Sequence, residues 1–309
     1  MNNPAANFPV IEVSPDAGTN AQTWIAENRN RLVEAVAKSG AVLLRGFELV
    51  TDQDFDRAIE QFAFPVFTYE ESLSNAVRKN RTDKVFTANE APPEIEIFLH
   101  HEMAQTPRYP SKLFFFCEQS AEEGGATPLC RSDLLLQAMK EQLPQFVEKC
   151  AEHGLKYTNV MPVAADAGSG QGRSWKSTLS CENAAEAEAR LTALGYSWQW
   201  QDDGSLRVTT PVLPAIRQLA CGTEVFFNQL IAASRGWDDT RNAAQKSVRF
   251  GDDSEIANAD MQQVADMAEA ITYNLQWQNG DMALVDNFLV MHGRRPFKGE
   301  RRVLASLVA

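Results

Sequence analysis

The sequence predicts an α+β fold with a mainly β core, either an antiparallel barrel or a jelly roll, with helices inserted between the strands. Short apolar runs of strand length recur along the chain, and the helical segments between them lack the regular alternation of a doubly wound sheet. No GxGxxG or GxxxxGK[ST] phosphate loop occurs. No repeat or long linker separates two folding units, so residues 1–309 are expected to form a single domain.

The elements expected in the first half of the chain follow from apolar spacing and end signals. AQTWIAENRNRLVEAVAKSG has apolar residues at helical spacing and stops at Gly40, and AVLLRGF reads as a buried strand. TDQDFDRAIEQFAF predicts a second helix, with Thr51 as N-cap and acidic residues in its first turn. KLFFFCE, from Lys112 to Glu118, has the length and apolar character of a strand.

The second half is expected to continue the same mixture. Residues Arg131 to Cys150 are predicted to be helical apart from Pro144, and ENAAEAEARLTALG forms another helix closed by Gly195. AADAGSGQGRS, from Ala164 to Ser174, is typical of a mobile surface loop. The remaining segments are predicted as a strand (EVFFNQL), a helix (MQQVADMAEAITYNL) and two final strands (DMALVDNFLVMHG and RRVLASLVA).

Composition excludes several classes of function. With 29 Lys+Arg against 41 Asp+Glu the net charge is −12, which argues against nucleic acid and against anionic membrane surfaces as partners. No stretch approaches the roughly 20 apolar residues of a membrane span, and the start MNNPAANFPVIEV lacks the features of a signal peptide. The five scattered cysteines contain no CxxC pair, which indicates reduced thiols in a cytoplasmic protein and disfavours a thiolate zinc site.

The four histidines give the strongest functional signal. His100 and His101 precede Glu102 in IEIFLHHE, and if this segment is a strand, His100 and Glu102 point to one face and His101 to the other. His292, in DNFLVMHGRRPF, is the best candidate for a third ligand. Two histidines and one carboxylate bind one face of an octahedral Fe(II) and leave three positions open. His153 is assigned no such role, because a helix C-terminus favours a cationic side chain.

The segments around both histidine motifs resemble the taurine dioxygenase / TfdA superfamily of Fe(II)/2-oxoglutarate-dependent oxygenases. The closer likeness is to its branch of syringomycin-biosynthesis-like and clavaminate-synthase-like enzymes. The matching stretches run from about Gly40 to the C-terminus and include AVLLRGF, the HHE segment, GGATPL, RSWKSTL, EVFFNQL and MHGRRPFKGERRVLASL. The resemblance implies a double-stranded β-helix (jelly roll) with helical insertions. It also implies His100, Glu102 and His292 as metal ligands, with 2-oxoglutarate and O₂ as cosubstrates.

The same resemblance implies where 2-oxoglutarate binds. Thr127 of GGATPL would bind one carboxylate, and an arginine of GERRVL would bind the far carboxylate through two parallel hydrogen bonds. Adjacent strand residues face opposite ways, so only one of Arg301 and Arg302 can bind this carboxylate. The motif spacing in the nearer branch favours Arg301, whereas the spacing in taurine dioxygenase could be read as Arg302.

Substrate recognition is less constrained. Asn228, Trp175 and Arg294 fall in family segments that approach the cavity and are candidates, although Arg294 could equally form a salt bridge outside it. The position of the sulfonate-binding arginine of taurine dioxygenase corresponds to Ala305 or Ser306, which disfavours a taurine-like sulfonate. A free amino acid, or one tethered to a carrier protein, is the expected substrate. The oligomeric state is left open.

The retained carboxylate of Glu102 favours hydroxylation over halogenation, because related halogenases have a small residue there. Desaturation, epoxidation and cyclisation use the same ligands and stay open. The rival from another class is a cupin-like hydrolase or isomerase that uses Zn²⁺, which would leave Thr127 and Arg301 unexplained. A catalytically silent binding protein is a further alternative, which the intact ligands argue against.

Overall fold

Two β-sheets form the centre of the protein in the computed structural model, which describes residues 8–67, 73, 78–88, 90–165, 172–235 and 247–309. The larger sheet has the order β1 (Val10–Val13), β2 (Ala41–Arg45), β15 (Met282–Asp286), β5 (Lys112–Gln119), β18 (Arg302–Val308) and β3 (Phe86–Thr87). The smaller has the order β14 (Tyr273–Leu275), β7 (Thr127–Arg131), β16 (Val290–Arg294) and β4 (Ile97–His100). Every pairing within them is antiparallel except β1 with β2.

The two sheets share one buried core. Leu129 and Val290 of the smaller sheet belong to the same hydrophobic cluster as Phe115, Ala283 and Ala305 of the larger one. In β2, β5, β15 and β18, alternate side chains supply this cluster, as expected of strands with one face toward a shared interior.

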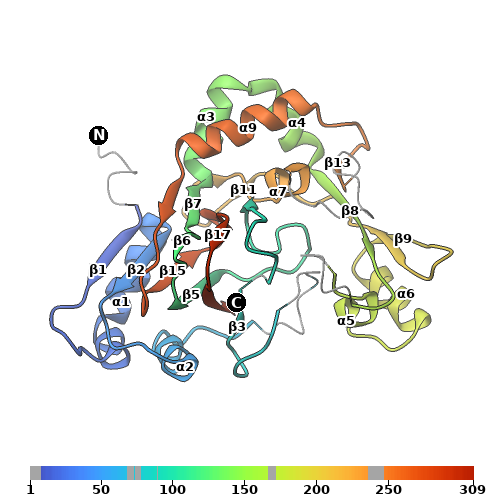
Figure 1. The fold of residues 1–309 in the computed structure, drawn as a ribbon. Helices are drawn as coiled ribbons and strands as arrows, with labels where there is room; N and C mark the ends of the chain where they lie inside the picture. Colours follow the sequence, from blue (N-terminus) through green and yellow to red (C-terminus); the bar gives the residue numbers. More distant parts are fainter. Residues whose placement is uncertain (1–7, 68–72, 74–77, 89, 166–171, 236–246) are drawn as a thin grey trace.

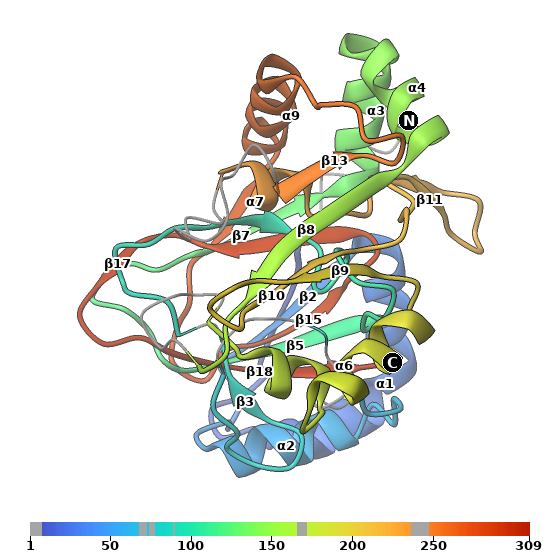
Figure 2. The ribbon, with the colours of Figure 1, turned by 90° about the vertical axis from the view of Figure 1, so that its right-hand side faces the viewer.

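Helices cover the outer face of each sheet (Figures 1 and 2). The larger sheet packs against α1 (Ala21–Ser39) and α2 (Asp52–Glu60). The smaller packs against α3 (Ser132–Gln142), α4 (Pro144–His153), α7 (Leu230–Arg235) and α9 (Asn258–Ala270). The result is a layered arrangement in which the space between the sheets is shielded from solvent on both sides.

The helix ends expected from sequence are confirmed. Gly40 ends α1 in the left-handed conformation, at φ +92°. Thr51 caps α2 in a capping box with Asp54. Pro144 is the first residue of α4, where its missing N–H costs nothing, so the expected helical stretch forms two helices.

A separate lobe is built mainly from the chain between α4 and α7, with one strand contributed from after α7. Its sheet has the order β13 (Val248–Phe250), β8 (Leu155–Met161), β10 (Leu206–Thr209) and β9 (Ser197–Trp200). With α5 (Trp175–Leu179) and α6 (Ala184–Ala193) it builds a small core of its own, at the right of Figure 1. Two short ribbons complete the fold: β11 (Arg217–Gln218) with β12 (Glu224–Val225), and β6 (Glu123–Gly124) with β17 (Phe297–Lys298).

Four element predictions were wrong in extent. The strand expected over IEIFLHHE ends at His100, and the one expected over EVFFNQL is only Glu224–Val225. DMALVDNFLVMHG is two strands in different sheets, because the chain turns at residues 287–289. The helix expected through residue 275 ends at Ala270 and is followed by β14. Periodicity identified the apolar runs but not the turns that divide them.

Most of the loop expected from Ala164 to Ser174 lies outside the described residues. In the part of the chain that the structure describes, no helix is both long enough and apolar enough to span a membrane.

Candidate metal and cosubstrate site

The register of the smaller sheet brings two distant histidines together. His292 in β16 pairs directly with His100 in β4, and cross-strand partners point to the same face of a sheet. Their ring centroids are 4.4 Å apart. The ring of Phe115, from the larger sheet, lies 5.3 Å from that of His292, so the pair faces the interior between the sheets.

A glycine makes this close pairing possible. A β-carbon on Gly293 would lie 2.3 Å from the carbonyl oxygen of Ile97, so no larger residue fits behind His292 without moving β4. The register also shifts by one residue between His292 and Arg294, a β-bulge of the kind found beside active sites.

Glu102 joins the histidines from a turn rather than from a strand. The residue that follows it, Met103, has a left-handed backbone at φ +59°, which is uncommon for a residue other than glycine and turns the chain away from β4. Candidate ligand atoms of His100, Glu102 and His292 lie within 4.8 Å of one another. Glu102 Oε2 is 3.5 Å from His292 Nε2, close to the spacing of about 3 Å between adjacent ligands of an octahedral ion.

The strand-alternation reasoning was therefore wrong for Glu102, but the choice of His100 over its neighbour agrees with the geometry. His101 is fully buried, and its two ring nitrogens face the backbone carbonyls of Asn287 and Phe226 at 2.5 and 3.1 Å. Burial lowers the pKa of His101 to about 3, so the ring is neutral and donates to only one of these carbonyls.

The protonation states suit a divalent cation. Burial and the neighbouring His292 lower the pKa of His100 to about 4, which leaves its imidazole neutral at pH 7. His100 Nδ1 lies 2.8 Å from the carbonyl oxygen of Phe98, so Nδ1 holds the proton and the Nε2 lone pair is available to a metal. Burial would raise the pKa of Glu102, but Arg78 and the two histidines outweigh it and hold that pKa well below its usual range.

Thr127 and Arg301 lie side by side next to this cluster. Thr127 begins β7, two residues before Leu129, which is the register partner of His292. Residues two apart on a strand share a face, so Thr127 points into the same interior. Its Oγ1 accepts a hydrogen bond from Trp277 Nε1 at 2.9 Å and lies 3.5 Å from Arg301 Nη2.

Arg301 has the properties of a cation that awaits an anion. Burial, with a contribution from the nearby Arg294, lowers the pKa of Arg301 to about 10. Its hydrogen bonds go to the carbonyl oxygen of Gly125 and weakly to Thr127, and it forms no ion pair with a carboxylate among the described residues. A buried charge without a counterion is costly, so this geometry suits an anionic ligand.

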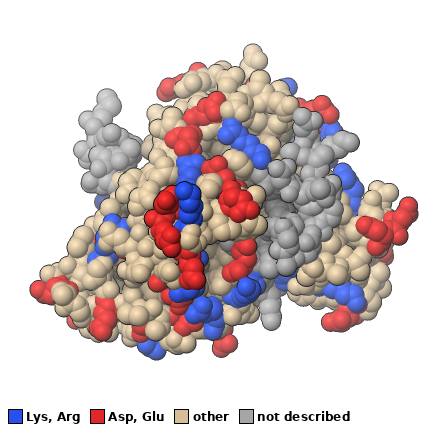
Figure 3. Space-filling view, in the orientation of Figure 1, with Lys and Arg blue, Asp and Glu red and all other residues tan. Residues whose placement is uncertain are grey.

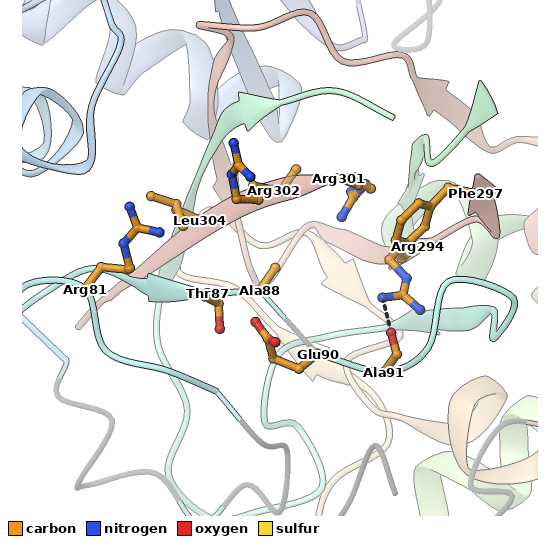
Figure 4. A pocket seen from close by; sticks show the side chains of 11 residues that line it. Arg81, Thr87, Ala88, Glu90, Ala91, Arg294, Phe297, Arg301, Arg302 and Leu304 are labelled. Carbon is orange, nitrogen blue, oxygen red and sulfur yellow. Dashed lines mark hydrogen bonds between the residues drawn. The ribbon is translucent and has the colours of Figure 1, made fainter. Parts of the chain in front are cut away.

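Arg302 is placed differently. Its side chain is 50% exposed and pairs with Glu118 and Glu300 at 3.0 and 3.1 Å. Figure 4 shows its guanidinium pointing away from that of Arg301, which gathers with Arg294 and Phe297 at one end of a cavity of about 190 Å³. The geometry therefore supports Arg301 rather than Arg302 as the carboxylate-binding residue.

All three substrate candidates have structural contacts, and Arg294 also lines the cavity next to Arg301. Arg294 donates to the backbone carbonyls of Ala91, Pro92 and Ile95, and so fixes the loop before β4. The side chain of Asn228 bonds the carbonyl of Ala215 and the N–H of Leu230.

Trp175, the third candidate, is buried in the core of the inserted lobe. Its ring packs edge-on against Trp200 at 5.2 Å. None of the three is placed beside the metal cluster by these contacts. Sequence motifs identified segments that approach the site, but not which way their side chains point.

Two residues that sequence reasoning missed organise the site. Asn287 is fully buried; its Oδ1 accepts the N–H of Glu102 at 2.7 Å, and its Nδ2 donates to the carbonyls of Glu102 and Pro110. Arg78 donates to Glu102 Oε1 at 2.8 Å, with both side chains 7% exposed. The Asp286–Asn287 pair lies between two apolar runs and is a turn signal that could have indicated Asn287. No sequence signal indicated Arg78.

Comparison with known proteins agrees with this site. Residues 8–307 match the family model described as taurine catabolism dioxygenase TauD, TfdA family. A clavaminate synthase-like protein of Arabidopsis thaliana is 38% identical over 305 residues, covering 98% of this chain and 91% of that protein. The dapdiamide synthesis protein DdaC of Enterobacter agglomerans is 27% identical over 290 residues, covering 89% and 84%.

Solved structures share the fold. An asparagine oxygenase superposes with a TM-score of 0.57 at 12% identity, over 93% of this chain and 81% of that one. The family and the branch expected from the sequence motifs are thus confirmed. The chain belongs to the TauD/TfdA family of dioxygenases and is an enzyme that uses iron, 2-oxoglutarate and O₂.

Proposed function

We propose that this enzyme hydroxylates an unactivated C–H bond of a small molecule, a free or carrier-bound amino acid or a related natural-product intermediate, with release of succinate and CO₂. One observation carries the proposal: two imidazoles and one ionised carboxylate converge beside a largely buried arginine that has no carboxylate partner in the described chain. A metal and a dicarboxylic acid satisfy these two groups at once.

His100, Glu102 and His292 are the proposed ligands of Fe(II). They contribute a single negative charge and occupy three positions, so that three remain for cosubstrate and O₂. The bound iron supplies the oxygen activation and the C–H oxidation that protein side chains cannot perform. The ionised carboxylate of Glu102 fills the position that chloride would need, which supports hydroxylation over halogenation.

Thr127 and Arg301 are proposed to bind the far carboxylate of 2-oxoglutarate. Because Thr127 Oγ1 accepts from Trp277, its own proton is free to be donated to a carboxylate oxygen. Arg301 can add two parallel N–H donors from its planar guanidinium. Phe297 lies 5.8 Å from the guanidinium of Arg301, which limits water on that side.

The fold that we propose for this site is a double-stranded β-helix, or jelly roll, formed by the two facing sheets, with residues 1–309 acting as one catalytic domain. The shared core and the largely antiparallel order support it. The helices that cover the two sheets, together with the inserted lobe, correspond to the helical insertions expected for this fold.

The substrate class rests on chemistry and on relatives. The asparagine oxygenase structure contains Fe(II), 3-hydroxyasparagine and succinate, and DdaC is named for dapdiamide synthesis. The charged lining of the cavity next to Arg301 is mostly basic, with Arg81, Arg294, Arg301 and Arg302 against Glu90, which suits a molecule that carries a carboxylate. On the face drawn in Figure 3, acidic and basic side chains are interspersed. The five free cysteines support a reducing, cytoplasmic location.

Two experiments test the proposal. Anaerobic addition of Fe(II) and 2-oxoglutarate should produce a weak visible charge-transfer band, and His292→Ala should abolish it. Succinate release should then be screened against a panel of free and carrier-linked amino acids. No band with the unmodified enzyme, or an unchanged band in His292→Ala, would contradict the metal assignment. A cupin-like Zn²⁺ hydrolase or isomerase predicts no response to 2-oxoglutarate. Product analysis separates hydroxylation from desaturation, epoxidation and cyclisation.

A further inference from the structure

The two carboxylate oxygens of Glu102 have different neighbours. Oε2 lies 3.5 Å from Nε2 of His292, on the side of the proposed metal. Oε1 accepts a hydrogen bond from Arg78 Nη2 at 2.8 Å. A carboxylate held in this way presents one oxygen to a metal and keeps the other engaged by the protein.

We infer that Arg78 is a positioning residue that fixes Glu102 as a one-oxygen ligand and so sets the affinity of the metal centre. The inference rests on the proposed function, because it takes Glu102 to be a ligand. A carboxylate free to rotate could bind a metal through both oxygens and occupy a second coordination position. By holding Oε1, Arg78 preserves the positions that 2-oxoglutarate and O₂ require.

The surroundings of Arg78 make it a fixed group rather than a chance contact. Its guanidinium lies 5.0 Å from the ring centroid of Phe86, in a cation–π arrangement. Phe86 belongs to β3 and pairs with Ala305 of β18, at the edge of the larger sheet. The arginine therefore connects the larger sheet to the turn that carries Glu102.

Another buried residue, Leu73, precedes Arg78 in the chain. Leu73 is 6% exposed and packs in the core of the inserted lobe with Met161, Trp175 and Leu179. Leu73 thus contacts the lobe, and Arg78 contacts the proposed metal-ligand carboxylate.

The electrostatics agree with this role. Arg78 and Glu102 are each 7% exposed, and a carboxylate buried to that degree is stable only when it is compensated. Arg78 supplies the compensation before a metal binds. Because the hydrogen bond from Arg78 goes to Oε1, it does not have to break when a metal binds Oε2.

The test is a titration of Mn(II) into the metal-free, full-length enzyme and its variants. Arg78→Met should weaken Mn(II) binding by about 10- to 100-fold, the usual effect of removing a group that orients a ligand. Arg78→Lys keeps the charge but loses the planar fork, so its affinity should fall between those of Arg78→Met and the unmodified enzyme. Arg45→Met is the matched control. It removes an arginine from another partly buried ion pair, with Asp281 at 2.6 Å, and should lose thermal stability while leaving Mn(II) affinity unchanged.

The outcomes are distinguishable. Equal or tighter Mn(II) binding by Arg78→Met would overturn the inference, since the arginine would then be idle or would compete with the metal for Glu102. Should Arg78→Met fail to fold, Arg78→Lys decides, and affinity equal to that of the unmodified enzyme would overturn it. An unmodified enzyme that binds no Mn(II) would instead contradict the metal centre itself, and with it the proposed function.

Discussion

Replacing Arg301 by Met should sharply weaken 2-oxoglutarate binding, whereas Arg302→Met should not. Arg301 is largely buried, has no carboxylate partner among the described residues and touches Thr127. Removing one member of a buried charge pair costs about 2–5 kcal/mol in binding. Because about 1.4 kcal/mol corresponds to a tenfold change in Kd, the affinity for 2-oxoglutarate should fall by at least about 30-fold.

Arg302 provides the matched comparison. Its side chain is 50% exposed and already paired with Glu118 and Glu300. Exposed ion pairs contribute at most about 1 kcal/mol, so Arg302→Met should change 2-oxoglutarate affinity by no more than about fivefold. The assay is an anaerobic titration of 2-oxoglutarate into the Fe(II)-loaded enzyme, followed by the visible charge-transfer band.

Thermal unfolding of the metal-free proteins separates lost binding from lost folding. Arg301→Met removes a buried cation that lacks a counterion, so the melting temperature should stay the same or rise. A larger loss of affinity in Arg302→Met than in Arg301→Met would refute the assignment. A lowered melting temperature in Arg301→Met would refute the claim that the arginine is held there for a ligand.

Three further predictions concern the rest of the site. Trp277→Phe removes the hydrogen bond to Thr127 Oγ1. Since such a bond contributes about 0.5–1.5 kcal/mol, 2-oxoglutarate binding should weaken about 2- to 10-fold in the same titration. Unchanged binding would mean that Thr127 does not need this hydrogen bond to bind 2-oxoglutarate. Gly293→Ala places a β-carbon 2.3 Å from the carbonyl oxygen of Ile97 and should lower the free energy of unfolding by about 1–3 kcal/mol and also weaken Mn(II) binding. Gly222→Ala is the control: its β-carbon meets nothing within 4 Å, but its φ of +86° strains any side chain, so it should lower stability and leave Mn(II) binding unchanged. Equal weakening of Mn(II) binding by both variants would argue against a special role for Gly293. Burial lowers the pKa of His100 to about 4 and that of His101 to about 3, so both side chains bind protons more readily in the unfolded chain than in the folded one. The melting temperature of the metal-free enzyme should therefore fall as the pH drops from 6.5 toward 4. A flat or rising melting temperature across that range would contradict neutral, buried histidines.

The sequence by itself determined the family, the cofactors and the local elements of this enzyme. Helix ends at Gly40 and Thr51 depend on neighbouring residues alone, so capping rules predicted them correctly. The HHE and MHGRRPF segments likewise identified the candidate ligands, because motif identity needs no knowledge of orientation.

Only the tertiary structure decided how these pieces meet. The pairing of His292 with His100, the hold of Asn287 on Glu102 and the separation of Arg301 from Arg302 all depend on contacts between segments that are distant in sequence. Periodicity placed Glu102 on a strand, whereas the left-handed backbone of Met103 puts it in a turn. Trp175 packs in the core of the inserted lobe, whereas Arg294 both holds the loop before β4 and lines the cavity next to Arg301. Arg78 had no signal at all, since its role exists only where the folded chain brings its guanidinium to Glu102.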